Sequence, residues 1–168
     1  MRIFMVGFMG SGKTHIGRKL AEILGYRFVD MDERIEAIEK CTVAKLFTDY
    51  GELYFRKLEH SHLLEIIGDD HIVVSTGGGA PCFFGNMDIM NSHGITVYLD
   101  TPIELLFGRL KHQLSKRPLL ANKSEPEVKQ FIADKISERL PYYSKAKIIL
   151  HQPENGDATL HQLLAMLK

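Results

Sequence analysis

Residues 7–14 of the chain read Gly-Phe-Met-Gly-Ser-Gly-Lys-Thr, and this stretch decides the fold class. It fits the phosphate-binding pattern G-x-x-x-x-G-K-[ST] in full, between an apolar run and a segment of helical periodicity. Glycines let backbone N–H groups approach phosphate oxygens closely, and the start of a helix adds a positive dipole. The pattern predicts a nucleoside-triphosphate site in which Lys13 reaches the β- and γ-phosphates and the Thr14 hydroxyl meets Mg²⁺. The other predicted contacts in this loop are Gly10, Ser11 and Gly12.

Short apolar runs alternate along the chain with longer segments of helical periodicity. This alternation is typical of βαβ units, in which helices cover both faces of a parallel sheet. We therefore expect an α/β, three-layer P-loop NTPase fold of the nucleoside-monophosphate-kinase-like type. Strands are predicted at 2–6, 26–30, 71–75, 95–99 and 147–150. Helices are predicted at 33–39, 43–49, 52–67 and 127–140, after Pro102, along a stripe of Ile16, Leu20, Ile23 and Leu24, and in a closing helix with Leu160, Leu163, Leu164 and Leu167.

Length and composition favour one compact domain over residues 1–168. Hydrophobic residues make up 45% and charged residues 25%, as in ordinary globular proteins. Lys+Arg and Asp+Glu are 21 each, and this balance argues against nucleic acid or a membrane surface as a partner. Cys41 and Cys82 cannot build a disulfide framework, and Gly7 ends the first apolar run before it could form a signal segment. We expect a cytoplasmic monomer.

Two regions are predicted to surround the phosphate loop. The helices between residues 31 and 68 are longer than a tight crossover, and such insertions commonly bind substrate. The stretch 113–126 is polar, basic and interrupted by Pro118 and Pro126, which indicates a mobile loop. We expect this loop to close over the site as a lid, because phosphoryl transfer requires that water be excluded.

Two other classes of nucleotide-binding protein lack their motifs here. A dinucleotide site requires G-x-G-x-x-G, whereas the glycines of the loop are spaced differently. A GTPase needs a guanine-reading N-K-x-D, but the Asn-Lys pair at 122–123 is followed by Ser and Glu. Two possibilities remain. The chain is either a kinase that uses ATP to phosphorylate a hydroxyl of a small molecule or a nucleotide-binding module without catalysis.

Two carboxylates, Asp30 and Asp32, stand at the end of the second predicted strand. An extended backbone would point them in opposite directions at the sheet edge that borders the ligand crevice. One could then serve the Mg²⁺ environment while the other points at an acceptor hydroxyl. The alternative is an acidic helix start, because either aspartate can cap the helix that follows.

Arg56 and Glu59 stand three residues apart, which makes them neighbours on one face of a predicted helix. They could form a surface ion pair, but such a pair contributes only about 0–1 kcal/mol. If Glu59 instead fixes Arg56, the guanidinium is a ready fork for a substrate carboxylate.

Further motifs follow the phosphate loop in order: Asp30-x-Asp32, Gly51-Glu52-x-x-Phe55-Arg56-x-x-Glu59, Ser75-Thr76-Gly77-Gly78-Gly79, Arg117-Pro118-Leu119-Leu120, and Arg139 followed by Tyr142-Tyr143. Together they give the chain a clear resemblance to the monofunctional bacterial shikimate kinases, over nearly its whole length. The resemblance implies transfer of the γ-phosphoryl group of ATP to the 3-hydroxyl of shikimate, giving shikimate 3-phosphate and ADP. It thereby implies a step in chorismate and aromatic amino-acid biosynthesis.

The resemblance also implies which residues carry out the phosphoryl transfer. Asp32 would contact the shikimate hydroxyls and deprotonate or orient the 3-hydroxyl. Asp30 would belong to the Mg²⁺ environment through water, with Ser75 near it. Arg117 would come from the lid and, beside Lys13, neutralise the transferring phosphate.

The same resemblance assigns the binding of shikimate. Arg56 and Arg139 would hold the carboxylate, Glu59 would support Arg56, and the ring would meet the backbone of Gly77, Gly78 and Gly79. The glycines could instead mark only a tight turn, Arg117 could be a solvated residue of a basic loop, and Arg139 could cap the end of its helix.

The resemblance assigns the adenine contacts to Arg109 and Pro153. The chain departs from the family pattern at Pro81, where a small aliphatic residue is usual. It departs again at Cys41-Thr42, where a glycine generally precedes the next helix. The nearest alternative function is a related kinase for another small polyol acid, such as gluconate.

Overall fold

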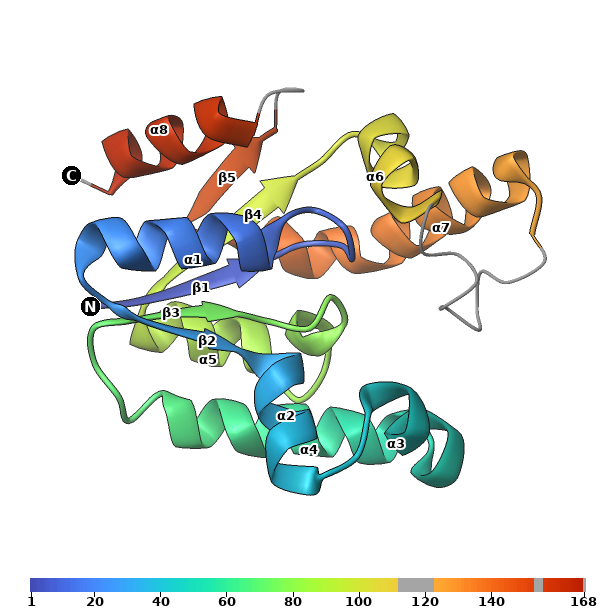
Figure 1. The fold of residues 1–168 in the computed structure, drawn as a ribbon, viewed down its shortest axis with the longest axis horizontal. Helices are drawn as coiled ribbons and strands as arrows, with labels where there is room; N and C mark the ends of the chain where they lie inside the picture. The colour runs from blue at the N-terminus through green and yellow to red at the C-terminus, as the bar shows by residue number, and fades with distance from the viewer. Residues whose placement is uncertain (112–122, 153–155, 168) are drawn as a thin grey trace.

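The structure is a computed structural model that describes residues 1–111, 123–152 and 156–167. Its strands are β1 (Arg2–Val6), β2 (Arg27–Asp30), β3 (Ile72–Ser75), β4 (Ile95–Asp100) and β5 (Ile148–His151). All neighbouring strands pair in parallel, in the order β2-β3-β1-β4-β5. Helices cover both faces of this sheet (Figure 1). Because β1 lies at the centre, the phosphate loop that follows it lies in the middle of the sheet edge, as the predicted fold requires.

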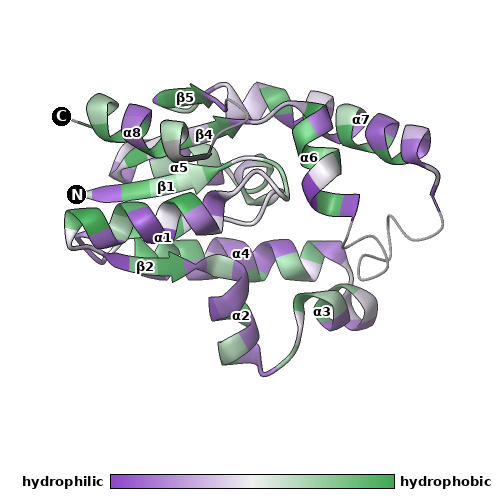
Figure 2. Cartoon of the chain, turned by 45° about the horizontal axis from the view of Figure 1, so that its top comes forward, coloured by the Kyte–Doolittle hydropathy of each residue, from purple (hydrophilic) through white to green (hydrophobic). Residues whose placement is uncertain are grey.

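The two faces of β1 belong to two different parts of the core, because successive side chains of a strand point in opposite directions. Ile3 and Met5 pack with α1 (Lys13–Leu24) and α8 (Gly156–Met166). Phe4 and Val6 pack with α4 (Glu52–Ile66) and α5 (Asn86–His93) on the other face. Figure 2 shows the result: most of β1 is coloured as hydrophobic, whereas α1 and α4 carry alternating hydrophilic and hydrophobic bands. This continuous apolar strand is typical of a parallel sheet covered on both sides.

A separate helical region stands beside the sheet, built from α2 (Met31–Glu39), α3 (Val43–Tyr50) and α4. Figure 1 shows α2 leading from the end of β2 toward α4, with α3 next to α4 and away from the strands. The region has its own small core of Ile35, Leu46 and Phe55. Thr42 caps α3, since its hydroxyl accepts a hydrogen bond from the Lys45 N–H at 3.3 Å. The departure from the family pattern at this position is therefore accommodated by a capping side chain.

A fourth cluster joins α6 (Ile103–Leu110) to α7 (Glu125–Tyr143) through Leu106, Leu110, Val128 and Ile132. Helix α7 begins earlier than predicted, with a capping box formed by Ser124 and Glu127. Pro126 therefore lies in the first helical turn, where a missing N–H costs nothing, and not in the preceding loop. Residues 113–122 of the predicted lid lie outside the described residues.

The strand predictions are confirmed, and their ends differ from the observed ones by at most one residue. The predictions missed α5 and the short helix η1 (Ala80–Cys82), in which Pro81 is buried. They also placed Ile23 on the buried stripe of α1, whereas it is exposed and the contact of α1 with the sheet is made by Ile16, Leu20 and Ala21. Across 1–111, 123–152 and 156–167, no helix is both long and apolar enough to cross a membrane.

Candidate active site

The phosphate loop connects the end of β1 to the start of α1. Gly10 has φ 79° and Gly12 has φ 94°, a left-handed backbone that other residues rarely adopt. At Gly10 a Cβ would also lie 3.2 Å from the Leu110 side chain. The glycines of the motif are thus required by the course of the loop itself, which turns sharply enough to aim N–H groups at a bound anion.

Lys13 extends along this loop and is buried. Its Nζ donates hydrogen bonds to the carbonyl oxygens of Gly7 at 2.8 Å and Phe8 at 2.9 Å. These contacts fix an ammonium at the start of α1, where the helix dipole is already positive. A positive charge held there can offset the negative charge of a triphosphate.

Thr14, Asp30 and Ser75 bring three oxygen-bearing side chains together next to the loop. The Thr14 hydroxyl donates a hydrogen bond to Asp30 Oδ2 at 2.7 Å. The Ser75 hydroxyl oxygen lies 3.3 Å from the Thr14 hydroxyl oxygen. Oxygen ligands of this kind suit Mg²⁺, which usually takes one or two protein groups beside substrate phosphates and water. The described residues contain no group of three or more His, Cys, Asp or Glu side chains that could hold a metal by themselves.

The sequence pattern predicted that Asp30 and Asp32 lie on one extended backbone, and the structure shows a different arrangement. The strand ends at Asp30, and Asp32 lies in the first turn of α2, so the two residues do not share an extended backbone. Asp30 is the helix cap, since its Oδ1 accepts from the N–H groups of Asp32 at 3.1 Å and Glu33 at 3.3 Å. The extended arrangement was wrong because the capping preference of Asp30 starts the helix at once.

The Asp32 carboxyl is accessible to solvent, yet many protein atoms surround it. Burial raises its pKa, and the nearby Asp30 raises it further, while Lys13 and Arg56 act in the opposite direction. A carboxylate with a raised pKa is a stronger proton acceptor than an ordinary aspartate. Asp32 can therefore orient a hydroxyl or accept its proton.

Arg56 and Glu59 form a buried ion pair, not the surface pair that was the alternative. Arg56 is 6% exposed and Glu59 is 1% exposed, with Nη1 and Oε2 2.6 Å apart. Burial raises the pKa of Glu59 to about 7, against the opposing effect of the Arg56 charge. Its other oxygen, Oε1, is buried and has no hydrogen-bond partner within the described part of the chain. Such burial costs stability, so the pair is better explained by function than by folding.

Aromatic rings surround the Arg56 guanidinium. Its Cζ lies 4.8 Å from the centre of the Phe83 ring and 5.6 Å from those of Phe47 and Phe55. Rings at these distances favour the cation and restrict its movement. The guanidinium is thus held in one orientation by side chains from α3, α4 and the segment after η1.

The three glycines after β3 are needed for space. A Cβ on Gly77 would overlap Glu59 Oε1 and lie 3.3 Å from Asp32 Oδ1, and one on Gly79 would lie 2.5 Å from Arg56 Cζ. None of the three has a positive φ, so the tight-turn alternative is not the reason for glycine here. Residues 77–79, called the glycine strip below, let the Glu59 carboxylate and the Arg56 guanidinium approach the backbone directly.

Gly78 connects the strip to the other half of the site. A Cβ there would lie 3.2 Å from Arg139 Nη1 and 3.4 Å from both the Gly7 oxygen and the Met9 nitrogen. Arg139 also lies over the Phe8 ring, with Cζ 5.5 Å from its centre. The guanidinium of Arg139 therefore faces the glycine strip and the phosphate loop from α7.

Arg109 lies on the opposite side of the phosphate loop. It donates to the Gly10 carbonyl at 3.0 Å and to Gln152 Oε1 at 3.2 Å, while Gln152 Nε2 donates to the Ser11 carbonyl at 2.8 Å. A hollow of about 350 Å³ opens here, lined by Gly10, Gly12, Lys13, Thr14, His15, Arg109 and Leu110. The space adjoins the phosphate loop and is large enough for part of a nucleotide.

The model of the family described as "Shikimate kinase" matches residues 9–168. The chain belongs to the shikimate kinase family. The predicted resemblance and the predicted function, an ATP-dependent kinase of the shikimate pathway, are thereby confirmed, as is the P-loop kinase fold.

Relatives of known sequence and structure agree with this membership. The shikimate kinase of Phocaeicola vulgatus is 46% identical over 156 residues, covering 93% of this chain and 89% of the relative. The crystal structure of the shikimate kinase from Bacteroides thetaiotaomicron superposes with a TM-score of 0.93 at 39% identity, covering 99% of this chain and 98% of that one. The Acinetobacter baumannii shikimate kinase in complex with shikimate gives a TM-score of 0.89 at 35% identity, covering 99% and 92%.

Sequence reasoning assigned no role to two residues that hold this region together. Tyr143 is fully buried, its hydroxyl donates to the Gly78 carbonyl, and its ring stacks on Tyr98. Gln152 bridges Ser11 and Arg109, as described above. Tyr143 belonged to a recognised motif, but Gln152 gave no signal beyond its place before Pro153.

Two predicted residues, Arg117 and Pro153, lie outside the described residues.

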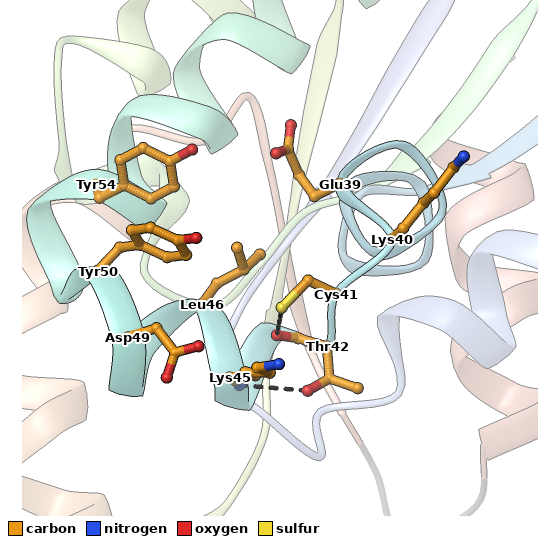
Figure 3. A pocket seen from close by; sticks show the side chains of 9 residues that line it. All are labelled: Glu39, Lys40, Cys41, Thr42, Lys45, Leu46, Asp49, Tyr50 and Tyr54. Carbon is orange, nitrogen blue, oxygen red and sulfur yellow. Dashed lines mark hydrogen bonds between the residues drawn. The ribbon is translucent and has the colours of Figure 1, made fainter.

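A second hollow, of about 400 Å³, lies between α2, α3 and the start of α4 (Figure 3). Tyr50 and Tyr54 line it with ring centres 4.8 Å apart, together with acidic and basic side chains. None of the described residues predicted for the site lines this hollow.

Proposed function

We propose that the phosphate loop binds the triphosphate of ATP while Asp32, Arg56 and Arg139 hold shikimate against the glycine strip. The observation that carries the proposal is the position of the strip. Its middle residue, Gly78, adjoins both the phosphate loop and Arg139, and its ends adjoin Asp32, Glu59 and Arg56. ATP, the phosphoryl donor, and shikimate, the phosphoryl acceptor, would therefore lie on two sides of the glycine strip. Phosphoryl transfer depends mostly on such positioning and on neutralising charge.

The carboxylate of shikimate gives the two arginines their role. Arg56 is fixed by Glu59 and the surrounding rings, and Arg139 faces the strip from α7. Planar guanidinium groups suit a carboxylate because they offer two parallel N–H donors. The Acinetobacter relative in complex with shikimate supports this choice of acceptor.

Asp32 would act on the 3-hydroxyl. In the transfer step the hydroxyl oxygen forms a bond to the γ-phosphorus, and the bond between that phosphorus and the bridging oxygen of ADP breaks. The hydroxyl proton passes to Asp32, whose raised pKa suits it to receive a proton. Lys13 would stabilise the charge that develops on the phosphoryl oxygens. Arg117 remains a proposed partner in this role.

Mg²⁺ would be held by the Thr14 hydroxyl and, through water, by Asp30. The donors present, a hydroxyl and a carboxylate oxygen 2.7 Å apart, are of the type that Mg²⁺ prefers. When bound, the ion would supply positive charge at the β- and γ-phosphates. Replacing Thr14 with Val removes the hydroxyl at nearly constant size, so the variant should need more Mg²⁺ for half-maximal activity.

We further propose that residues 31–68 form the substrate-binding region of a single kinase domain, residues 1–168. Asp32 on α2 and Arg56 on α4 both come from this region, which supports the assignment. We keep the prediction that the chain is a cytoplasmic monomer. Light scattering of the purified chain and fractionation of the source cells would test these two points.

A coupled assay for ADP release tests the function directly. We expect ADP only when shikimate, ATP and Mg²⁺ are all present, and little ADP with gluconate or a nucleoside monophosphate as acceptor. Activity on gluconate but not on shikimate would reject the acceptor assignment. Nucleotide binding without turnover of any acceptor would instead indicate a module without catalysis.

A further inference from the structure

We propose that Glu52 is an internal competitor for the carboxylate of the substrate and so sets both the affinity and the acid specificity of the acceptor site. The inference rests on the proposed function, because it assumes that Arg56 receives that carboxylate. Glu52 Oε1 accepts hydrogen bonds from Arg56 Nε at 3.2 Å and from Nη2 at 3.0 Å. These two donors form the side of the guanidinium that a carboxylate can engage with two parallel bonds.

The other parts of the guanidinium are less accessible to a ligand. Nη1 is bonded at 2.6 Å to Glu59, which is buried, and the Phe47, Phe55 and Phe83 rings lie within cation–π distance of Cζ. The Nε–Nη2 side instead points to Glu52, whose side chain is 58% exposed. A carboxylate that arrives from solvent therefore meets Arg56 at the side that Glu52 occupies.

The two glutamates that contact Arg56 differ in how easily they can leave. Glu59 lies in the interior of the helical region, where leaving Arg56 would strand a buried charge. Glu52 is the first residue of α4 and can rotate into water without disturbing the core. Glu59 is thus the permanent partner of Arg56, and Glu52 is the exchangeable one.

This exchange has a consequence for specificity. When a substrate carboxylate replaces Glu52, Arg56 keeps the same number of charged partners, and the displaced glutamate gains hydration. A neutral polyol offers no such replacement, because it would leave the Arg56 donors with weaker, uncharged acceptors. The site would therefore favour acids over neutral alcohols, at the cost of a lower affinity for the acid.

The variant Glu52→Gln tests the competition. Glutamine keeps the length and a hydrogen-bond acceptor but removes the charge, and charge-assisted bonds are roughly twice as strong as neutral ones. We expect the KM for shikimate to fall about threefold or more, with a smaller change in kcat and in the KM for ATP. Glu65→Gln is the matched control. Glu65 lies on the same helix, is 55% exposed and pairs with Arg34 at 2.7 Å, so it reports the effect of losing one negative charge elsewhere.

Inhibition by a simple carboxylate gives a second readout. Cyclohexanecarboxylate carries the acid without the hydroxyls, and cyclohexanecarboxamide is its neutral counterpart. Glu52→Gln should lower the inhibition constant of the acid, measured against shikimate, and leave that of the amide unchanged. A fold defect would not produce this difference between the two compounds.

A rise in the KM for shikimate in Glu52→Gln, or a change no larger than in Glu65→Gln, would overturn the proposal. The first result would mean that Glu52 positions Arg56, and the second that only net charge matters. If the glutamine variant does not fold, Glu52→Ala applies the same test, since alanine removes the carboxylate and should also lower the KM. Failure of the proposed function would look different, because the unmodified chain would then release no ADP with shikimate.

Discussion

Replacing Gly79 with Ala is the most direct test of the idea that the glycine strip exists to admit Arg56. The new Cβ would lie 2.5 Å from Cζ and 2.7 Å from Nη1 of Arg56, whereas an ordinary contact begins at 3.4 Å. The guanidinium would have to retreat by about 0.9 Å, the shortfall at Cζ. It has little room to do so, because Glu59 and the Phe83 ring already contact it.

A displacement of about 1 Å in a positioning group can reduce the rate about 10²-fold. We therefore expect kcat/KM for shikimate to fall by about that factor in Gly79→Ala. The KM for ATP should change little, because the nucleotide half of the site does not include Arg56. Steady-state measurements with each substrate varied in turn would separate these two effects.

Gly108→Ala provides the matched control for this prediction. Gly108 lies in α6, and a Cβ added there would meet nothing within 4 Å. This variant should keep the shikimate kinetics and raise the free energy of unfolding by up to about 1 kcal/mol, since alanine favours helix. Shikimate kinetics in Gly79→Ala that equal those of Gly108→Ala would refute the steric argument.

Three further perturbations address other parts of the site. Asp32→Asn should lower kcat about 10²- to 10⁴-fold if Asp32 orients the hydroxyl or accepts its proton, and wild-type turnover would exclude both roles. Gln152→Ala should raise the KM for ATP and leave that for shikimate unchanged, because Gln152 joins the phosphate loop to Arg109; equal effects on both would point to a general loss of structure. Burial raises the pKa of Glu59 to about 7 from an ordinary 4.5, so the folded state binds this proton more tightly than the unfolded state. As the pH rises from about 4.5 to 7, the free energy of unfolding should therefore fall by at most about 3 kcal/mol. In denaturant titrations at several pH values, Glu59→Gln should reduce this dependence on pH.

The sheet and the phosphate loop could be predicted from sequence because local signals and tertiary structure agree there. The apolar run of β1 has no polar side chain after Arg2, and the loop glycines mark its end. Helix α5 was missed because Asn, Asp, Ser and His are weak helix formers. Its stability comes from Met87 and Met90, which are buried against the sheet, and packing of that kind leaves no pattern in a short segment.

The pairing of Arg56 with Glu59 could be predicted from the sequence, but its geometry could not. The sequence indicated that Arg56 and Glu59 pair, but it could not indicate that they pair inside the protein. The sequence showed the three glycines of the strip. Their reason is the close approach of side chains from α2, α4 and α7 to the backbone of the strip, and only the folded chain brings these helices together. The contact between Glu52 and Arg56 had a signal in the four-residue spacing, which places both on one face of α4.

Asp30 offers each of its oxygens to a different element, one to the amides of α2 and one to the Thr14 hydroxyl. An asparagine could keep the amide cap, but it would present its NH₂ group to the Thr14 hydroxyl, which would then have to accept a hydrogen bond instead of donating one. A spontaneous or engineered change at Asp30 should therefore affect the helix start and the nucleotide side together.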